Sequence, residues 1–405
     1  MKDECIVITW LARDQPGFLD FAYRVRALAK AYRTTLVSPY PLTQPELAYA
    51  GVESCVLPYG DGRAGWIGYM LACARLVRAR KPACAVLLHS ILTPLVLLTG
   101  KTPTALYWNE HPSRFTASPP GHPWWKRVAR HLALQVFFLQ AAKMADLVMP
   151  IGEAHHEELL RLGCRPGRVR LLYMGVDASF VRRRDEQASR RTDAPLELVY
   201  NGTVNHLRGR DVMLEAIVLA NLERPIARLT IVGACEEQIA YCTGYAIRFG
   251  IADAVRVGGR IPGREIPGIL ENADAGLCFM EDLPWWRFNP PTKLFEYLVA
   301  GVPVLASDIR THTQYVTNWY NGMICQYDSR SLADAIGLLW QRRADLPYLK
   351  RNARRSGEQY LWDRIEPEFL QAIKTIARSS GPLSAQPSQA IKKAAAVDKL
   401  SKEAR

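Results

Sequence analysis

A lysine and a glutamate stand at the start of a short helical pattern that leads into an apolar strand. Residues 293–300 predict the helix, Gly301 its C-cap, and 302–306 a buried strand. Lys293 and Glu296 are three apart, so both lie on one helix face near its positive N-terminal end. The ammonium and the helix end suit a phosphate, and the carboxylate can accept two hydrogen bonds from a ribose diol. The spacing therefore indicates a sugar-nucleotide site, and the alternative is an ordinary αβ unit with a surface Lys–Glu pair.

A second candidate phosphate site is the loop 201–209, which follows a strand and opens a helix. Parallel α/β sheets bind phosphate at this edge, where the strands end. Arg208 stands next to the helix N-terminus and is able to clamp a diphosphate with two parallel hydrogen bonds. A capped loop with a solvated arginine is the alternative.

The stretch 291–304 resembles the C-terminal-domain signature of GT-B glycosyltransferases, especially the large retaining family 4. The resemblance covers roughly residues 5–375 and is strongest in 196–306. It implies that Glu296 binds the ribose and that Lys293 faces the diphosphate. The family usually has an arginine after the first glycine of the 201–209 loop and a lysine before the second. Thr203 and Arg208 occupy these places, so one cation is missing here and Lys293 takes more of the charge.

The resemblance also implies a wider set of binding residues. Gly17, in the turn that closes the first βα loop, resembles the N-domain glycine loop, although a plain turn glycine fits equally well. Ile261 lies in the loop 258–262, which passes over the nucleotide base in the family; a tight turn alone also explains its glycines. The expected nucleotide-sugar-binding residues are Gly17, Gly202, Thr203, Arg208, Ile261, Lys293, Leu294 and Glu296.

A polar pair, Glu110 and His111, ends a predicted strand at the edge where ligands bind. Family members often carry a related pair near the donor sugar and the acceptor. His111 is then expected to contact the sugar, and Glu110 to take the acceptor proton. A polar loop that caps the next helix is the alternative. With Arg208 and Lys293, these two complete the expected catalytic set.

One departure from the family concerns an acid that commonly lies eight positions before the signature glutamate. Phe288 occupies that position here, and Glu281 and Asp282 lie further upstream. Either one of these acids reaches the donor sugar or backbone N–H groups replace it. The sequence leaves that choice open.

A long amphipathic pattern over 124–144 begins with Trp124 and Trp125 and carries Lys126, Arg127 and Arg130. Aromatic residues with cations fit a helix at a membrane interface, and they also fit a half-buried domain helix with a basic face. The interpretation taken here is contact with an anionic membrane, which would suit a lipid-linked acceptor.

Composition places the chain among soluble, cytoplasmic proteins with anionic partners. Its 405 residues carry a net charge of +13, which favours phosphate-rich partners, although no aromatic-basic module for nucleic acid appears. The nine cysteines include no Cys-x-x-Cys, so reduced thiols are expected. No apolar run is long enough to span a bilayer, and the charged start enters a strand directly, unlike a signal peptide. The pair His155 and His156 is taken as part of a surface helix, so neither a metal nor a cofactor is expected.

Strands alternate with helices through the chain, which predicts an α/β fold of two Rossmann-like doubly wound domains facing a central cleft. The expected strands of the first half are 5–9, 34–38, 85–88, 105–108, 147–150 and 169–172. The expected domains are 1–180 for the acceptor, a linker at 181–195, 196–345 for the nucleotide sugar, helices over 346–378 that cross back to the first domain, and a disordered tail at 379–405.

Together these features predict a metal-independent hexosyltransferase that acts in cell-surface polysaccharide synthesis. It would move a sugar from a nucleotide diphosphosugar to a lipid-linked or glycan acceptor, with retention of configuration, at the inner face of the plasma membrane. Two alternatives remain: a catalytically weak, membrane-associated scaffold of a polysaccharide assembly complex, and a GT-B sugar-nucleotide epimerase. The nucleotide, the sugar and the linkage are not fixed by the sequence.

Overall fold

The computed structural model describes residues 2–11, 18–42, 49, 51–60, 62–117, 121, 123–181 and 194–378. Contacts divide the chain into two compact units. Among the described residues, the first unit holds 2–11, Arg24–Tyr173 and 366–378, and the second holds 18–23 and Met174–Ile365. Gly17, most of the expected linker (182–193) and the expected tail (379–405) lie outside the described residues.

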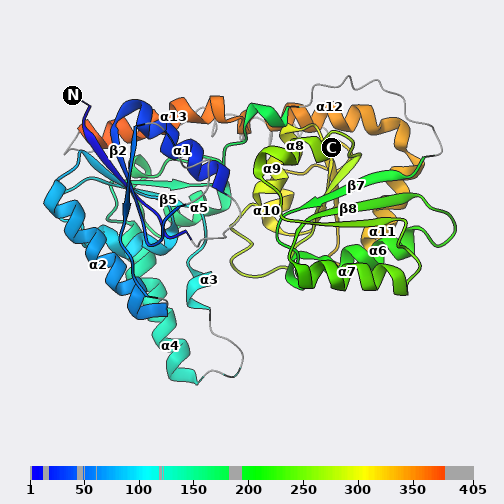
Figure 1. Cartoon of the computed structure of the whole chain (residues 1–405), viewed down its shortest axis with the longest axis horizontal. Coiled ribbons are helices and arrows are strands. Elements are labelled where there is room, and N and C mark those ends of the chain that lie inside the picture. The colour runs from blue at the N-terminus through cyan, green and yellow to red at the C-terminus, as the bar shows by residue number, and fades with distance from the viewer. Residues whose placement is uncertain are drawn as a thin grey trace. The chain divides into compact units, whose positions relative to one another are not determined.

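The first unit contains a parallel six-stranded sheet (Figure 1). Its strands are β1 (Glu4–Ile8), β2 (Arg33–Ser38), β3 (Val52–Val56), β4 (Cys84–Leu87), β5 (Thr104–Trp108) and β6 (Leu147–Pro150). The order β3-β2-β1-β4-β5-β6 confirms the predicted doubly wound sheet. The expected strand at 169–172 is wrong, because only a single bridge joins Val169 to Val148. The edge strand β3 was not predicted.

Most helices of the first unit lie between its strands or follow β6. They are α1 (Phe18–Ala31), α2 (Gly62–Arg80), α3 (Ser113–Thr116), α4 (Trp124–Ala133), α5 (Glu153–Arg161) and, near the C-terminus, α13 (Trp362–Arg378). A 3-10 stretch covers Ser90–Leu97. The predicted helix 124–144 instead divides into α4 and a π-helical stretch, Leu134–Gln140, which continues it with a wider turn.

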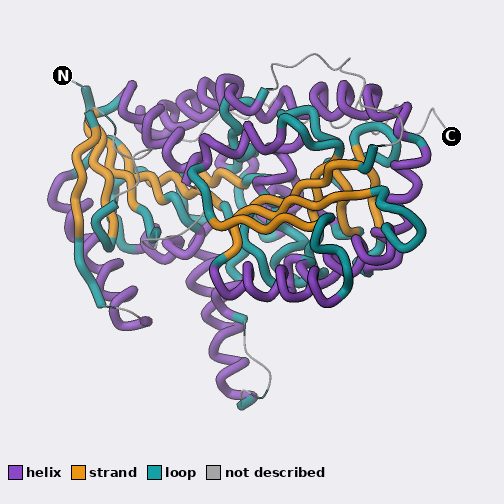
Figure 2. The backbone as a smooth tube through the Cα atoms, turned by 45° about the vertical axis from the view of Figure 1, so that its right-hand side comes forward, coloured by secondary structure: helices purple, strands orange, loops and turns teal. Residues whose placement is uncertain are grey.

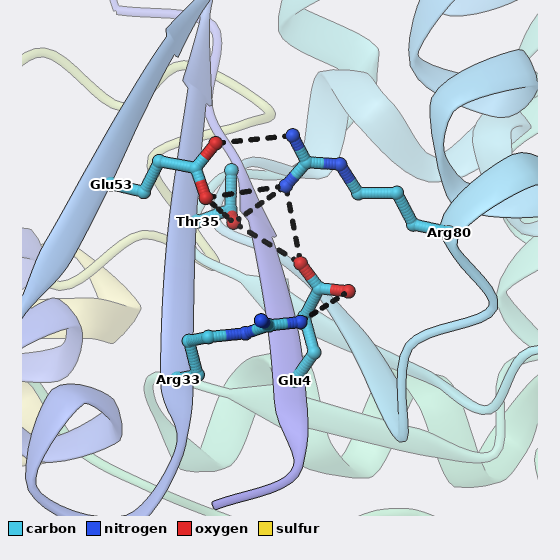
Figure 3. A network of polar contacts seen from close by, with 5 residues as sticks. All are labelled: Glu4, Arg33, Thr35, Glu53 and Arg80. Atoms are coloured by element: carbon cyan, nitrogen blue, oxygen red, sulfur yellow. Dashed lines mark hydrogen bonds and ion pairs between the residues drawn. The ribbon is translucent and has the colours of Figure 1, made fainter.

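Charged side chains fasten the amino ends of β1, β2 and β3 (Figure 3). Arg80, at the end of α2, donates to Glu4 at 3.1 Å and to Glu53 at 3.0 Å, and Thr35 donates to Glu53 at 3.2 Å. The hydrogen bond from Arg80 is the main cause that lowers the pKa of Glu53. This network stabilises the amino edge, which is opposite to the carboxyl edge where such sheets bind ligands.

The second unit repeats the plan. Its strands are β7 (Leu196–Asn201), β8 (Ala227–Ala234), β9 (Val255–Gly259), β10 (Ala275–Cys278), β11 (Val304–Ser307) and β12 (Gly322–Cys325), in the order β12-β11-β10-β7-β8-β9. Its helices are α6 (Arg210–Ala220), α7 (Glu236–Arg248), α8 (Ile266–Leu270), α9 (Thr292–Val299), α10 (Arg310–Thr313), α11 (Ser329–Gln341) and α12 (Leu346–Gly357). Figure 2 shows the strands as twisted orange layers between purple helices.

The strand order fixes where each sheet can bind a ligand. The connections reverse direction between β1 and β4 in the first sheet and between β7 and β10 in the second. Loops diverge at such a switch point and leave a crevice at the carboxyl ends of the strands. In the second unit, the residues that follow β7 and β10 are therefore placed to form the site. Among the described residues, no helix combines the length and the apolar character that crossing a bilayer requires.

Candidate functional site

Glu296 is anchored to the end of β7 by a side-chain hydrogen bond. Asn201, the last residue of β7 and only 6% exposed, donates from Nδ2 to Oε2 of Glu296 at 2.8 Å. The backbone N–H of Asn201 in turn donates to the hydroxyl of Tyr297 at 3.2 Å. Burial raises the pKa of Glu296, while the Asn201 hydrogen bond and the charge of Lys293 oppose that shift. One carboxylate oxygen is thus fixed, and the other can accept hydrogen bonds from a ligand.

Lys293 is buried and rests on an aromatic ring instead of pairing with an acid. Its Nζ lies 3.3 Å from the centroid of the Tyr200 ring, and the residue is 6% exposed. The pKa of Lys293 is lowered to about 7, mainly by burial and to a smaller extent by the charge of Arg208, while Cys278 and Glu296 oppose the shift. No ion pair joins Lys293 to Glu296 in the part of the chain that the structure describes. The alternative of a surface Lys–Glu pair is therefore wrong for this helix.

Arg208 lies on a short 3-10 turn, His206–Arg208, directly before α6. Asn205 caps this turn, because its Oδ1 accepts from the backbone N–H of Arg208 at 3.0 Å. Gly209 then adopts φ +75°, and a Cβ there would lie 2.6 Å from the Cβ of Phe279. The glycine therefore lets the Arg208 turn approach the residue that follows β10. Two cations, Arg208 and Lys293, meet at the switch point.

The backbone of the loop after β7 packs closely against its neighbours at the end of β8 and on α9. Tyr200 donates its hydroxyl to the carbonyl of Thr203 at 2.6 Å, so the ring that carries Lys293 also shapes the loop. Gly202 has φ +120° and faces Lys293. Gly233, at the end of β8, has φ +109°, and a Cβ there would lie 2.4 Å from the carbonyl oxygen of Gly202. The sequence interpretation missed Gly233, although a glycine between a strand and the start of α7 is a signal for close backbone approach.

Two other expected binding residues lie at different depths. Leu294 follows Lys293 on α9, has no exposed surface, and donates its backbone N–H to the carbonyl of Pro291 at 3.0 Å. Its side chain therefore belongs to the core. Ile261 is partly buried and follows β9, which is paired with β8.

The loop between β10 and α9 is folded on itself and contains the expected acids. Asp282 forms an ion pair with Arg287 at 2.8 Å on the surface. The backbone N–H of Glu281 donates to the carbonyl of Leu207 at 3.0 Å, so this loop is fastened to the Arg208 turn. Phe288 is partly buried in the same loop. Of the two acids, Asp282 is already paired.

Glu110 and His111 belong to the first unit, after β5. Glu110 forms an ion pair with Arg114, one helical turn ahead. His111 is 6% exposed; its Nδ1 lies 2.7 Å from Oγ of Ser113 and its Nε2 lies 3.0 Å from a carboxylate oxygen of Glu158. The side chains of Glu110 and His111 thus both have partners within the protein. Such contacts are also expected of a polar loop that precedes a helix.

His89 is a buried residue that the sequence interpretation missed. It follows β4 at the switch point of the first sheet, and its Nδ1 accepts from the backbone N–H of Trp10 at 3.2 Å. Burial lowers the pKa of His89 to about 3, so the imidazole is neutral near pH 7. The sequence feature that could have indicated it is a histidine just after an apolar strand, at the same carboxyl edge of the first sheet as Glu110.

The helix α4 projects from the body of the first unit (Figure 1), and none of its residues is buried. Trp124 is 69% exposed and Leu132 is 56% exposed. Trp125, Val128 and Leu132 follow i, i+3, i+7 spacing and share a face, whereas Lys126, Arg127 and Arg130 lie on the other side. Lys126 lies over the Trp125 ring at 5.3 Å, and Arg130 donates to the carbonyl of Ala117. The apolar stripe faces solvent.

The chemistry available in the second unit is electrostatic. Among the described residues, no group of three or more His, Cys, Asp or Glu side chains is arranged to hold a metal ion. Two cations and the N-terminal ends of α6 and α9 meet at the end of β7. Such groups bind and stabilise a phosphate-bearing leaving group through charge and backbone N–H donors.

Comparison with known proteins confirms the resemblance to glycosyltransferases. Residues 195–342 match the family model described as glycosyl transferases group 1. The D-inositol 3-phosphate glycosyltransferase of Streptosporangium roseum is 25% identical over 46% of this chain and 45% of that protein. The putative colanic acid biosynthesis glycosyltransferase WcaL of Escherichia coli is 24% identical over 58% of this chain and 56% of that protein. The chain thus spans about half the length of the curated relatives it matches.

Solved structures show the fold over nearly the whole chain. The Anabaena protein HepE in complex with UDP superposes with a TM-score of 0.70, 15% identity, and coverage of 93% of this chain and 100% of HepE. WaaG, a glycosyltransferase involved in lipopolysaccharide biosynthesis, gives a TM-score of 0.68 at 15% identity, with 92% and 100% coverage. The predicted GT-B, α/β fold is confirmed.

Proposed function

We propose that this chain, whose residues 195–342 match the group 1 glycosyl transferases, transfers a sugar from a nucleotide diphosphosugar to a lipid-linked or glycan acceptor in cell-surface polysaccharide synthesis. The observation that carries the proposal is the meeting of a buried cation, Lys293, and an anchored carboxylate, Glu296, on the first turns of one helix. Relatives named for colanic acid and amylovoran biosynthesis support the polysaccharide context.

In this proposal each group at the end of β7 has one task. Glu296 accepts hydrogen bonds from the ribose hydroxyls through the oxygen that Asn201 leaves available. Lys293 and Arg208 neutralise the diphosphate, and the first N–H groups of α6 and α9 add donors. As the bond to the sugar breaks, charge grows on the departing phosphate oxygen, and the same cations stabilise it. HepE, whose solved complexes hold UDP and UDP-glucose, makes uridine donors the first to test.

We further propose that the configuration at the anomeric carbon is retained. The observation that favours retention is the engagement of the candidate bases: Glu110 is paired with Arg114, and His111 with Ser113 and Glu158. An inverting enzyme needs a positioned base that deprotonates the acceptor. A retaining enzyme can use the departing phosphate as the proton acceptor on the same face, with Arg208 and Lys293 holding it.

The protein acts at the inner face of the plasma membrane in this proposal, with α4 as the contact. Its exposed apolar stripe and the cations beside it match the two requirements of an interfacial helix, apolar area and attraction to anionic lipid. The chain's net charge of +13 adds long-range attraction.

A panel of nucleotide diphosphosugars tests the function directly. Thermal unfolding is followed with each donor, and a donor at about 100 times its dissociation constant is expected to add roughly 2.7 kcal/mol of stability. The stabilising donor is then incubated with lipid-linked and free glycan acceptors, and transfer is read by mass spectrometry. Binding with no transfer to any acceptor would favour the scaffold alternative, and conversion of the donor's sugar without an acceptor would favour the epimerase.

A further inference from the structure

We propose that Trp286 is a positioning residue for the diphosphate, because its indole ring holds the guanidinium of Arg208 while leaving the donors of that guanidinium available. The inference rests on the proposed function, and it deepens it by naming how this chain holds one of its two cations. Cζ of Arg208 lies 5.5 Å from the centroid of the Trp286 ring. Trp286 is 7% exposed, so the ring is itself fixed.

The partner of Arg208 matters because a carboxylate partner would compete with phosphate. Within the described residues, no acid forms an ion pair with Arg208, and its side chain makes no hydrogen bond. A ring face attracts a cation through its quadrupole and occupies none of the N–H donors. The guanidinium is thereby oriented and still able to bind a phosphate with two parallel hydrogen bonds.

The loop that carries Trp286 is built to keep the ring in place. Met280, Trp286 and Ile309 form a buried apolar cluster against which Leu207 packs. Thr311 donates its hydroxyl to the carbonyl of Trp286 at 2.6 Å. The hydrogen bond from Glu281 to Leu207, at 3.0 Å, joins the loop to the Arg208 turn. The loop after β10 and the loop after β7 are thus joined by a hydrogen bond and by apolar packing, and Arg208 contacts the Trp286 ring across them.

Lys293, like Arg208, is held against an aromatic ring. Its ammonium lies on the Tyr200 ring, and no acid is paired with it in the described part of the chain. Two cations at one site are thus held by aromatic faces, which leaves both available for one dianionic ligand. Trp286 stands in the same loop as Phe288, two positions before it.

The experiment measures the affinity of full-length protein for UDP, UMP and uridine by calorimetry, in the parent, Trp286→Leu, Arg208→Ala and the double variant. Trp286→Leu is expected to weaken UDP binding on the order of ten-fold, UMP binding less, and uridine binding not at all. In the Arg208→Ala background, Trp286→Leu is expected to cause little further loss, since the two residues act on one phosphate contact. A merely structural role would weaken all three ligands alike and add to the Arg208→Ala loss.

Trp285→Leu is the matched control. Trp285 packs on the same apolar cluster in the same loop. The Trp285→Leu variant should therefore have a UDP affinity near the parent value. If Trp286→Leu does not fold, Trp286→Phe, which keeps a smaller ring, takes its place. An intermediate loss of UDP affinity in Trp286→Phe that is absent in the Arg208→Ala background supports the role. Unchanged UDP affinity in a folded Trp286→Leu protein, or equal losses in Trp285→Leu, overturns the inference alone. A parent that binds no nucleoside diphosphate overturns the proposed function as well.

Discussion

Nδ2 of Asn201 lies 2.8 Å from Oε2 of Glu296, so the last residue of β7 holds the carboxylate of α9 in one orientation. The two residues are far apart in sequence, and the switch between β7 and β10 brings their elements together. Because Asn201 donates only to one oxygen, the other keeps its lone pairs for a ligand. The relationship turns a glutamate on a helix into a preorganised acceptor.

Glu296→Gln is expected to weaken donor binding while the fold persists. The amide keeps the shape of the side chain but accepts hydrogen bonds less well than a carboxylate. Losing a charged hydrogen bond costs roughly 1.5–3 kcal/mol, about ten- to a hundred-fold in affinity. Calorimetric titration of the parent and of Glu296→Gln with the donor measures the loss of affinity. A uridine ligand that lacks the 2′ and 3′ ribose hydroxyls should bind both proteins equally. Equal donor affinity in folded Glu296→Gln would remove the ribose assignment.

Arg208 and Lys293 are expected to act as a unit on the diphosphate. Arg208→Ala and Lys293→Ala should each slow transfer strongly, and the double variant should lose less than the sum, because both cations serve one charge. Steady-state rates of the four proteins give the coupling free energy. Arg210→Ala is the matched control, since that arginine is paired with Asp211. Near-normal rates in both single variants would place the phosphate elsewhere.

Donor affinity should fall as pH rises through neutrality. Burial lowers the pKa of Lys293 to about 7 in the free protein, and only its protonated form attracts the diphosphate. Affinity is therefore expected to be constant below about pH 7 and to fall by up to about ten-fold per pH unit above it. The diphosphate of an intact sugar nucleotide keeps its charge over this range, so the donor does not contribute. Lys293→Met should bind weakly with a flat profile, and a parent profile that is equally flat would contradict the role.

The same lysine should reduce stability in the absence of ligand. Its folded pKa, about 7, lies below the value of about 10.4 that is usual for an exposed lysine. The unfolded state therefore binds more protons between these values, so the parent gains stability from this group as pH rises from 7 to 10. Lys293→Met is expected to have the higher unfolding temperature at pH 6, with a difference that shrinks toward pH 10. Thermal unfolding of both proteins across this range measures it, and a parent that is the more stable at pH 6 would contradict the cost of burial.

The sequence predicted the sheets well because buried parallel strands are continuous apolar runs. It missed β3, whose residues Glu53 and Ser54 are exposed at the sheet edge, so the strand lacks that apolar signal. It extended the helix from Trp124 without the change to π-helical turns, which depends on packing and not on periodicity. Local spacing and the resemblance to the family predicted Lys293, Glu296 and Arg208 as candidate site residues. Their partners Asn201, Tyr200 and Trp286 come from other elements, and nothing in local sequence indicates such contacts.

Reversing the charge of α4 should release the protein from anionic membrane. Each basic residue near such a surface contributes about 1 kcal/mol, so Lys126→Glu, Arg127→Glu and Arg130→Glu together should abolish binding to vesicles with anionic lipid. The parent's binding should weaken as salt is added. A control with Arg351, Arg355 and Lys374 changed to Glu alters the net charge equally at exposed sites elsewhere and should still bind. Vesicle binding that survives the α4 changes, or is absent in the parent, would leave α4 without this role.

Retention of configuration leads to opposite expectations for two residues. If the departing phosphate accepts the proton, Arg208→Ala should slow transfer severely, because the developing charge loses its donor pair. Glu110→Gln should slow it only modestly, since Glu110 is held in an ion pair with Arg114. NMR of the product gives the anomeric coupling, which is compared with that of the donor. An inverted product, together with activity abolished by Glu110→Gln and spared by Arg114→Gln, would make Glu110 the base that deprotonates the acceptor. The acceptor hydroxyl would then attack the anomeric carbon from the face opposite the departing diphosphate, and the cations at the end of β7 would serve donor binding more than proton transfer.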